Sequence, residues 1–391
     1  MRSVRDISVH GKRVFVRVDY NLPMNDQGLI TDDNRIRQTL DLIRYLQEKQ
    51  ARIILASHLG RPKGGYEKRF SLAPVADHLS ELLGEKVVFV PDCIGPAVSD
   101  QVAALKNGDI LMLENLRFHK QEKSNDAVFA GQLADLCDVY VNEAFAVSHR
   151  DQASVTGIVA HVPVAAAGFL LEREMNAYAD AFENPERPLV AVIGGAKVSG
   201  KLAALENLLN TVDQMVIGGA MANTFLLSQG IDTKASLIEP DLKDTAARIL
   251  QKAQEKKIDV YLPEDLVVAD SFAETAETES VELDAVPDGW LVMDIGPRTA
   301  ETFNQVISKA KTIVWNGPMG VFEMQPFMAG TCAVATGIAR ADAFSVVGGG
   351  DTGLAARECG VKEQVSYVST GGGAFLHLME GKKLPGVVAL G

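Results

Sequence analysis

Short apolar runs rich in β-branched residues alternate with helix-type patterns along the whole chain of 391 residues. Strands that alternate with helices form parallel sheets whose two faces are both covered by helices. We therefore predict an α/β fold of doubly wound, Rossmann-like parallel sheets. The expected strands occupy residues 14–18, 52–56, 86–90, 109–113, 139–142, 189–193, 214–218, 259–263, 290–295, 312–315, 344–347 and 365–369.

The length of the chain predicts two domains, because one hydrophobic core rarely serves this many residues. Residues 165–182 have a long helical pattern, and the breaker cluster NPERP follows them before the next strand. We expect this helix to join the two sheets and to act as a hinge. The acidic segment 274–285 reads as an exposed connection.

Composition excludes several classes of function. No apolar run approaches the roughly 18–20 residues of a membrane span, and the first residues lack the apolar stretch of a secretory signal. The net charge of −13 argues against nucleic-acid partners. Almost all of the negative net charge lies after residue 170. The first half of the chain is therefore better suited to bind an anionic small molecule. Alternatively, the acidic second half is simply a solubilising surface.

The four cysteines lie far apart in the sequence without a C-x-x-C spacing. This pattern predicts neither a zinc site nor a disulfide framework, and it favours a reducing, cytoplasmic setting. The cysteines are Cys93, Cys137, Cys332 and Cys359.

Most expected strands of the first half end in arginine, histidine or another polar residue. In open parallel sheets ligands bind beyond the carboxyl ends of the strands. Several guanidinium groups at one edge suit a small, multiply charged anion, whereas a single arginine is better explained as a surface residue. The residues at these positions are Asp19, Tyr20, Asn21, Arg35, His58, Arg61, Lys63, Arg117, His119 and Arg150.

A glycine segment follows the first strand of the second half. Gly195 to Lys201 fits G-x-x-x-x-G-K, but Leu202 stands where a P-loop needs Ser or Thr to hold Mg²⁺. We therefore do not interpret it as a P-loop. Lys197 and Lys201, on one side of an expected helix start, either clamp a phosphate or belong to a solvent-facing helix turn.

A second glycine segment contains an unexpected acid. Gly348, Gly350 and Gly353 match the dinucleotide-binding motif G-x-G-x-x-G. The motif also requires an acidic residue at the end of the next strand to bind the ribose, and the sequence has none there. The carboxylate of Asp351 would repel a phosphate directly. It either coordinates Mg²⁺, which then bridges to the phosphate oxygens, or it caps its helix. Both interpretations stay open. Residues 371–373 form a further glycine turn before a helix, which is another anion site.

Seven segments, in this order and spacing, resemble the phosphoglycerate kinase family. They are VDYNLP, SHLGRP, LENLRFH, GGAKVSGK, WNGPMGVFE, GGGDT and STGGGAFL, and the resemblance runs from about Val18 to about Gly386. It implies a glycerate-binding domain at 1–168, a nucleotide-binding domain at 169–375 with the linking helix at 165–182, and a C-terminal segment at 376–391 that returns to the first domain. It also implies a cytoplasmic, monomeric enzyme of glycolysis that uses Mg²⁺ and transfers a phosphoryl group between 1,3-bisphosphoglycerate and ADP, giving 3-phosphoglycerate and ATP.

The resemblance assigns expected roles to individual residues. The glycerate ligands would be Asp19, Tyr20, Asn21, Arg35, His58, Leu59, Gly60, Arg61, Arg117 and Arg150. The nucleotide ligands would be Gly195, Lys201, Gly218, Gly219, Asn316, Pro318, Glu323, Gly349, Gly350, Asp351 and Thr352, with Asp351 holding the metal. The groups around the transferred phosphoryl would be Arg35, Lys197, Lys201, Gly372 and Gly373.

Phosphoryl transfer from or to a carboxylate needs no general base, because the carboxylate is already ionised at neutral pH. The reaction depends on positioning and on neutralised charge, so we expect His58 to donate a hydrogen bond rather than to act as a base. Two other functions remain open on the residues alone. One is an NAD-dependent dehydrogenase built on the glycine fingerprint, and the other is a two-lobed protein that binds a phosphorylated ligand without chemistry.

Overall fold

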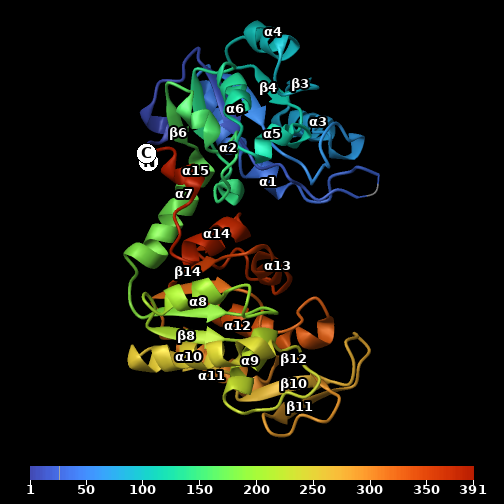
Figure 1. Cartoon of the computed structure of the whole chain (residues 1–391), viewed down its shortest axis with the longest axis vertical. Coiled ribbons are helices and arrows are strands. Elements are labelled where there is room, and N and C mark those ends of the chain that lie inside the picture. Colours follow the sequence, from blue (N-terminus) through green and yellow to red (C-terminus); the bar gives the residue numbers. More distant parts are fainter. Residues whose placement is uncertain (26) are drawn as a thin grey trace. The chain divides into compact units, whose positions relative to one another are not determined.

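The computed structural model describes residues 1–25 and 27–391, which form two compact units. Unit 1 consists of Met1–Met175 together with Lys383–Gly391, and unit 2 consists of Asn176–Lys382. Each unit contains a parallel β-sheet flanked by helices (Figure 1). The predicted α/β class with two parallel sheets is confirmed.

The sheet of unit 1 has six strands among the described residues, in the order β3-β4-β2-β1-β5-β6, and every pair is parallel. Most residues of its central strands are apolar and buried because helices cover both faces. Their side chains form one core with the helices. The strands are β1 (Arg13–Arg17), β2 (Arg52–Ala56), β3 (Val87–Val90), β4 (Ile110–Leu113), β5 (Val139–Asn142) and β6 (Ala165–Ala167).

The helices of unit 1 are amphipathic or short. The helical pattern after residue 33 is split at Thr39, whose hydroxyl donates to the carbonyl of Ile36 at 2.8 Å. Near the C-terminus the backbone N–H of Gly386 donates to the carbonyl of Ser148 at 2.8 Å, which ties the last helix to unit 1. The α-helices are α1 (Asn34–Arg37), α2 (Leu40–Glu48), α3 (Ala73–Leu83), α4 (Pro96–Ala104), α5 (Lys120–Lys123), α6 (Ala127–Ala134) and α15 (Pro385–Val388), and the 3₁₀ turns are η1 (Val4–Asp6), η2 (Lys68–Phe70), η3 (Leu116–Phe118), η4 (Phe145–Val147) and η5 (Gly157–Ala160).

The parallel sheet of unit 2 also has six strands in the described part of the chain, in the order β15-β14-β13-β7-β8-β9. Every residue of its two central strands, β7 and β13, is buried. The strands are β7 (Leu189–Ile193), β8 (Gln214–Ile217), β9 (Asp259–Tyr261), β13 (Thr312–Asn316), β14 (Phe344–Val347) and β15 (Tyr367–Val368).

Unit 2 contains a second, antiparallel sheet that the sequence pattern did not predict. Its order is β11-β10-β12, with bounds Thr278–Glu282, Asp265–Ala269 and Leu291–Ile295. The prediction of a connection at 274–285 is therefore wrong, because β11 lies inside it, whereas the predicted exposure is confirmed. β11 is charged, so it lacks the apolar run that indicates most of the other strands. Strands β6 and β10 were not predicted either, and the strand expected at 290–295 belongs to this antiparallel sheet as β12.

The helices of unit 2 cover its parallel sheet and pack against the antiparallel one. They are α8 (Leu202–Leu208), α9 (Ala220–Ser228), α10 (Lys243–Glu255), α11 (Pro297–Ile307), α12 (Ala329–Arg340), α13 (Gly350–Glu358) and α14 (Gly372–Met379), and the 3₁₀ turns are η7 (Pro240–Leu242) and η8 (Gln325–Phe327).

Helix α7 (Phe169–Tyr178) contains the boundary between the two units, which falls between Met175 and Asn176. The helix starts later than the pattern from residue 165 indicated, because Ala165–Ala167 pair with β5 as strand β6. A π-helical turn, η6 (Ala179–Glu183), extends it. The buried carboxylate of Glu143 accepts a hydrogen bond from the backbone N–H of Leu170 at 2.9 Å and so stabilises the start of α7.

The absence of a disulfide, expected from the cysteine spacing, is wrong, and the cysteines no longer support a reducing setting. Cys332 in α12 and Cys359 at the end of α13 are joined by a disulfide with a Cα–Cα distance of 5.1 Å. Cys93 and Cys137 are free and buried. The two bonded residues are distant in sequence, and only the packing of α12 beside α13 brings them together.

Across the residues that the structure describes, every helix is too short or too polar to span a lipid bilayer.

Candidate functional site

The carboxyl ends of the parallel strands of unit 1 carry a cluster of cationic and polar side chains. Asp19 and Asn21 follow β1, His58 follows β2, Arg117 lies in η3 after β4, and Arg150 comes after β5. Because the strands are parallel, these ends meet at one edge of the sheet. We call this set, together with Arg17 and Arg35, the arginine cluster.

An ion pair organises the centre of the arginine cluster. Arg35 Nη1 lies 2.5 Å from Asp19 Oδ2, and Asp19 is largely buried. Asp19 Oδ1 lies 3.6 Å from His58 Nδ1. Arg35 belongs to α1, so this pair ties the first helix to the end of β1. Asp19 thus pairs with Arg35 and lies beside His58, and its expected contact with the glycerate stays a prediction.

His58 is buried and electrically neutral. Burial lowers its pKa well below the usual value, and the positive charges of Arg17 and Arg117 lower it further. Arg17 Nη2 lies 3.3 Å from His58 Nδ1. A neutral imidazole between arginines can donate or accept a hydrogen bond without adding another charge, which agrees with the role expected for His58.

Arg117 is a buried cation with unused hydrogen-bonding capacity. Its Nη1 donates to the carbonyl of Gly60 at 2.7 Å. Its Nε and Nη2 have no hydrogen-bond partner among the described residues. Burial lowers the pKa of Arg117 to about 10, and the charges of Arg150 and Arg17 contribute. Buried donors without partners cost free energy, so this group is arranged for an anion that supplies the missing acceptors.

The turn after β2 is held in place by side chains of the same cluster. Asn21 Oδ1 accepts a hydrogen bond from the backbone N–H of Gly60 at 2.8 Å. Gly60 has φ +64°, and a Cβ there would collide with the ring of Phe70. Arg61 follows on the surface. Glycine is therefore needed for the turn that brings Arg61 next to the cluster.

Two expected glycerate ligands have buried apolar side chains instead. Tyr20 is completely buried, and its hydroxyl lies 2.7 Å from Thr39 Oγ1. Leu59 packs in the same core. Neither side chain is free to contact a ligand, so any contribution of these two residues comes from the backbone.

Four loops of unit 2 are bonded to one another at the carboxyl ends of β7, β8, β13 and β14. The backbone N–H of Gly195 donates to the carbonyl of Pro318 at 3.0 Å, and that of Gly219 donates to Met319 at 2.9 Å. The amide of Asn316 donates from Nδ2 to the carbonyl of Gly348 at 2.7 Å. Gly218 lies directly between β8 and Gly219. Six expected nucleotide residues thus share one platform, here called the glycine platform: Gly195, Gly218, Gly219, Asn316, Pro318 and Gly349.

Lys201 lies beneath the glycine platform. Its Nζ donates to the carbonyls of Gly194 and Asn316 at 2.6 and 2.7 Å. Burial lowers its pKa to about 8, and the charge of Asp351 partly opposes this shift. Helix α8 begins only at Leu202, so Lys197 and Lys201 precede the helix and do not share one of its faces, as the spacing had indicated. Lys197 is exposed.

Two helix N-termini meet at the glycine platform. Helix α13 begins at Gly350 and α14 begins at Gly372. A Cβ on Gly372 would lie only 3.1 Å from the backbone nitrogen of Gly350, so a side chain there would press the two helices apart. The N-terminal ends of two helices, with the positive ends of their dipoles, therefore adjoin, which favours an anion.

Asp351 occupies the first turn of α13 but does not cap it. The N-cap is Gly349, and no side chain caps this helix end in the described structure. The carboxylate is exposed and lines a cavity. Thr352 serves a different purpose, because its buried hydroxyl accepts a hydrogen bond from the backbone N–H of Gly317 at 2.7 Å. The structure does not support the helix-cap interpretation of Asp351, and the metal interpretation stays a prediction.

A cavity of about 340 Å³ opens beside the glycine platform within unit 2. The predicted residues that line it are Gly195, Gly219, Pro318, Glu323 and Asp351. Its apolar wall comes mainly from the antiparallel sheet and the segments around it, including Leu266, Phe272, Leu291, Met293 and Met319.

Sequence reasoning missed that apolar wall and also missed Arg17. The wall could not be found because the antiparallel sheet itself was not predicted. Arg17 did have a signal, since it is a charged residue within a buried strand. Its Nε donates to Ser154 Oγ at 2.8 Å, so it is bonded internally and supports the cluster by charge.

A cluster of arginines in one parallel-sheet unit and paired glycine-rich helix N-termini in another are typical of α/β enzymes that transfer phosphoryl groups. The family model for phosphoglycerate kinase matches residues 4–382. The chain belongs to the phosphoglycerate kinase family, and it is a kinase of glycolysis whose phosphoryl acceptor is a carboxyl group.

Individual phosphoglycerate kinases are similar to this chain over nearly their full length. The chain is 63% identical to phosphoglycerate kinase of Desulforapulum autotrophicum over 390 residues, covering 100% of both chains. It is 54% identical to that of Desulfotalea psychrophila, again covering 100% of both. The solved phosphoglycerate kinase of Coxiella burnetii is 45% identical with a TM-score of 0.92, covering 99% of this chain and 98% of that one. That of Pyrococcus horikoshii is 35% identical with a TM-score of 0.85 and covers 100% and 98%.

Proposed function

We propose that the enzyme reversibly transfers a phosphoryl group between the acyl phosphate of 1,3-bisphosphoglycerate and ADP, giving 3-phosphoglycerate and ATP. The observation that carries this proposal is the buried, incompletely bonded guanidinium of Arg117 within a cluster of further arginines. Such a cluster suits a small molecule with both a phosphate and a carboxylate.

Unit 1 is proposed to bind the glycerate. Arg117 and Arg150 neutralise its phosphate, and the neutral His58 donates a hydrogen bond to it. Asp19 and Asn21 act by holding Arg35 and the Gly60 turn in position. The support is geometric, because each of these residues lies at the carboxyl edge of the parallel sheet. Arg61 completes the set from the surface.

Unit 2 is proposed to bind the nucleotide. The adenine enters the apolar cavity, Glu323 accepts hydrogen bonds from the ribose hydroxyls, and the phosphates lie over the glycine platform and the start of α13. A cavity with one apolar wall and polar groups at its edge suits an adenine nucleotide. Lys201 reaches the phosphates from beneath.

Asp351 is proposed to hold Mg²⁺ that accompanies the nucleotide. The exposed carboxylate of Asp351 at the cavity offers the oxygen ligand that a hard divalent cation prefers, and the cation would keep most of its waters. When bound, the ion supplies positive charge to the phosphate oxygens. Without such a cation, the negative charge of Asp351 would oppose phosphate binding at this helix.

The transfer step is proposed to rest on charge and positioning. The acceptor carboxylate needs no base, so the residues of the chain orient the reactants and stabilise the equatorial oxygens. Arg35, Lys197 and the backbone N–H groups at Gly372 and Gly373 surround the phosphoryl group. The ligands of the two units must come together for reaction, and water must be excluded because an acyl phosphate hydrolyses readily. Helix α7 is the proposed hinge.

The proposal includes two points about the setting of the enzyme. It acts in the cytoplasm, where the intermediates of glycolysis occur. It acts as a monomer, since one copy of the chain supplies every proposed ligand group.

A coupled assay tests the proposed reaction directly. Purified enzyme, 1,3-bisphosphoglycerate, ADP and Mg²⁺ should yield ATP, detected by hexokinase and glucose-6-phosphate dehydrogenase. Omission of Mg²⁺ should abolish ATP formation when ATP is separated and measured directly, since hexokinase itself requires Mg²⁺. Failure to form ATP, with the ligands still bound, would indicate a binding protein. Reduction of NAD by the enzyme itself would indicate a dehydrogenase.

A further inference from the structure

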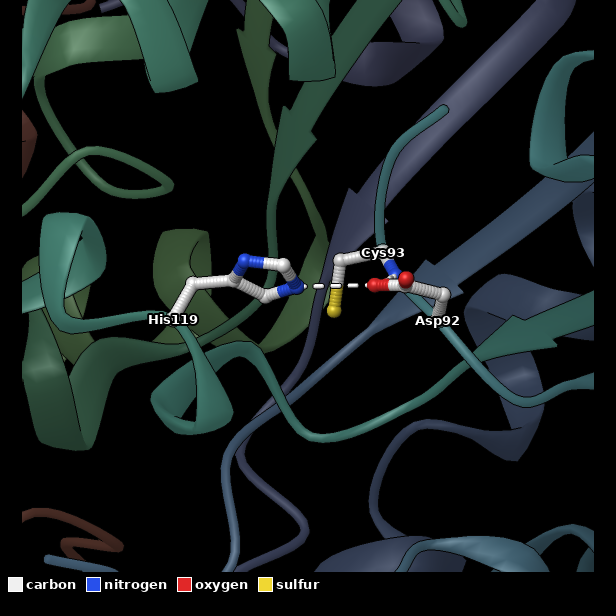
Figure 2. A group of neighbouring side chains, drawn as sticks. All are labelled: Asp92, Cys93 and His119. Atoms are coloured by element: carbon white, nitrogen blue, oxygen red, sulfur yellow. Dashed lines mark hydrogen bonds and ion pairs between the residues drawn. The ribbon is translucent and has the colours of Figure 1, made fainter. Parts of the chain in front are cut away.

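Three potential metal ligands meet in unit 1 outside the arginine cluster. Asp92 and Cys93 follow β3, and His119 lies between η3 and α5. One ligand atom from each residue, a carboxylate oxygen, Cys93 Sγ and an imidazole nitrogen, lies within 4.8 Å of the other two. Figure 2 shows the sulfur of Cys93 pointing to the space between His119 and Asp92. We propose that these three residues bind a zinc-type divalent cation.

The chemistry of the three ligands selects the class of cation. Thiolate, imidazole and carboxylate together suit Zn²⁺ and similar borderline ions, whereas Mg²⁺ prefers oxygen ligands alone. Three protein ligands leave one tetrahedral position for water. The site therefore differs in kind from the magnesium position proposed at Asp351.

The three ligands are held in place by the surrounding structure. Asp92 Oδ1 accepts hydrogen bonds from the backbone N–H of Cys93 at 2.7 Å and from His119 Nε2 at 2.8 Å. The imidazole of His119 stacks on the ring of Phe129, with centroids 5.0 Å apart. Tetrahedral coordination requires ligand atoms roughly 3.3–3.7 Å apart, given bond lengths of about 2.0–2.3 Å. Small side-chain shifts are therefore sufficient.

One of the three ligands is buried, and the other two are accessible to solvent. Cys93 is completely buried, and its Sγ donates to the carbonyl of Glu114 at 3.0 Å. The side chain of Asp92 is 55% exposed and that of His119 is 25% exposed, so an ion can reach the sulfur from solvent between them. Burial raises the pKa of the Cys93 thiol well above its usual value. The charges of Asp92, Glu114 and Glu122 raise this pKa further, so the thiolate forms only with a bound cation.

Binding changes the protonation of the ligands in a defined way. In the metal-free state Cys93 carries a thiol proton, and His119 donates from Nε2 to Asp92. The cation forms bonds to sulfur, nitrogen and oxygen. The thiol proton leaves to solvent, and Nε2 of His119 gives up its proton to Nδ1 or to solvent in order to bind the ion. At least one proton is therefore released for each ion bound, with no oxidation or reduction.

The position of the site indicates what binding would do. The site joins the loop after β3 to the loop after β4, and these strands are neighbours in the sheet. His119 is two residues from Arg117, so the cation would fix the turn that carries this member of the arginine cluster. We expect it to stabilise unit 1 against unfolding.

Cobalt titration of the metal-free enzyme tests the proposal. Co²⁺ should produce a near-ultraviolet thiolate-to-cobalt charge-transfer band at one equivalent, Zn²⁺ should abolish it, and a tenfold excess of Mg²⁺ should not. Cys93→Ser should remove the band, whereas Cys137→Ser, which changes the other buried free thiol, should retain it. Asp92→Asn should weaken Co²⁺ binding by at least about tenfold.

A second readout keeps the test decisive if the Cys93 variant fails to fold. His119→Asn should then weaken cobalt binding by at least about tenfold and reduce the Zn²⁺-induced rise in the thermal unfolding midpoint. Absence of a thiolate band in the wild-type enzyme would overturn the proposal. A band that disappears in Cys137→Ser and persists in Cys93→Ser would overturn it as well.

Discussion

The arginine cluster consists of charged residues that constrain one another. Asp19 neutralises Arg35, while burial keeps His58 uncharged and leaves two donors of Arg117 without partners among the described residues. The residues of the cluster thus differ in charge and in hydrogen bonding, although most of them are arginine or histidine. Arg35 is 37% exposed and held by one carboxylate, so it can turn toward a ligand at modest cost.

Arg35→Ala should lower kcat by on the order of 10²-fold or more and change the KM for 3-phosphoglycerate much less, because the guanidinium is proposed to act mainly on the transition state. Steady-state kinetics in the reverse direction, with 3-phosphoglycerate and ATP as substrates and ADP formation followed, measures both constants. Arg37→Ala is the matched control, since Arg37 lies in the same helix and pairs with Asp33 on the surface. An unchanged kcat in Arg35→Ala would remove Arg35 from this role.

Lys201 should make nucleotide binding dependent on pH. Its pKa in the free enzyme is lowered to about 8 by burial, so above that pH the free amine is neutral. A bound phosphate favours the charged form and raises the pKa again. Binding of ADP should therefore take up a proton above about pH 8 and weaken as the pH rises.

Calorimetry in two buffers of different ionisation enthalpy measures this proton uptake. Lys201→Met should abolish it, and the surface variant Lys252→Met should keep it. The same proton uptake in Lys201→Met as in the wild-type enzyme would assign the titration to another group.

At the scale of elements, strand ends and helix starts place the functional groups. Loops after β7, β8 and β13 bond to one another, and α13 and α14 begin side by side with glycine at the contact. These positions follow from parallel pairing, because parallel strands end at one edge of the sheet. The same rule explains why distant motifs such as residues 195–201 and 348–353 belong to one platform.

The sequence predicted the parallel sheets well because their strands are continuous apolar runs. It could not reveal β11, whose charged residues face solvent, and the apolar wall of the cavity was missed with it. Nor could it show that Tyr20 turns into the core, or that α7 begins at Phe169 after a short strand. Such features depend on partners far away in the sequence.

The disulfide between Cys332 and Cys359 should stabilise unit 2. It links α12 to the end of α13 across 27 residues, and closing a loop of this size contributes about 2–4 kcal/mol. Cys332→Ser combined with Cys359→Ser should therefore lower the denaturation midpoint of oxidised protein, measured by urea unfolding. Cys137→Ser serves as the single-thiol control.

A thiol count checks the premise of that prediction. The denatured, unreduced protein should expose two free thiols, from Cys93 and Cys137. Four free thiols, or an unchanged unfolding midpoint in the double variant, would contradict the stabilising role.

At the scale of the whole molecule, the chain divides its proposed ligand groups between two units. The glycerate groups belong to unit 1 and the nucleotide groups to unit 2, while α7 contains the boundary. Neither unit holds both reactants in this proposal. Chemistry therefore requires the ligands to be brought together, and binding free energy from both would drive that change.

Both ligands together should compact the enzyme. Small-angle X-ray scattering should show a smaller radius of gyration with 3-phosphoglycerate and a non-hydrolysable Mg-ATP analogue than with either ligand alone. An unchanged radius in the doubly liganded enzyme would count against a hinge at α7.

The central claim is that unit 1 recognises the glycerate and unit 2 recognises the nucleotide. Isothermal titration calorimetry of Arg117→Met and Asp351→Asn with each ligand tests it most directly. Arg117→Met should weaken 3-phosphoglycerate binding by roughly 10–100-fold, as expected for lost charged hydrogen bonds, and leave Mg-ADP binding within about twofold. Asp351→Asn should show the opposite pattern. Equal loss of both ligands in either variant, or a reversed pattern, would contradict the account.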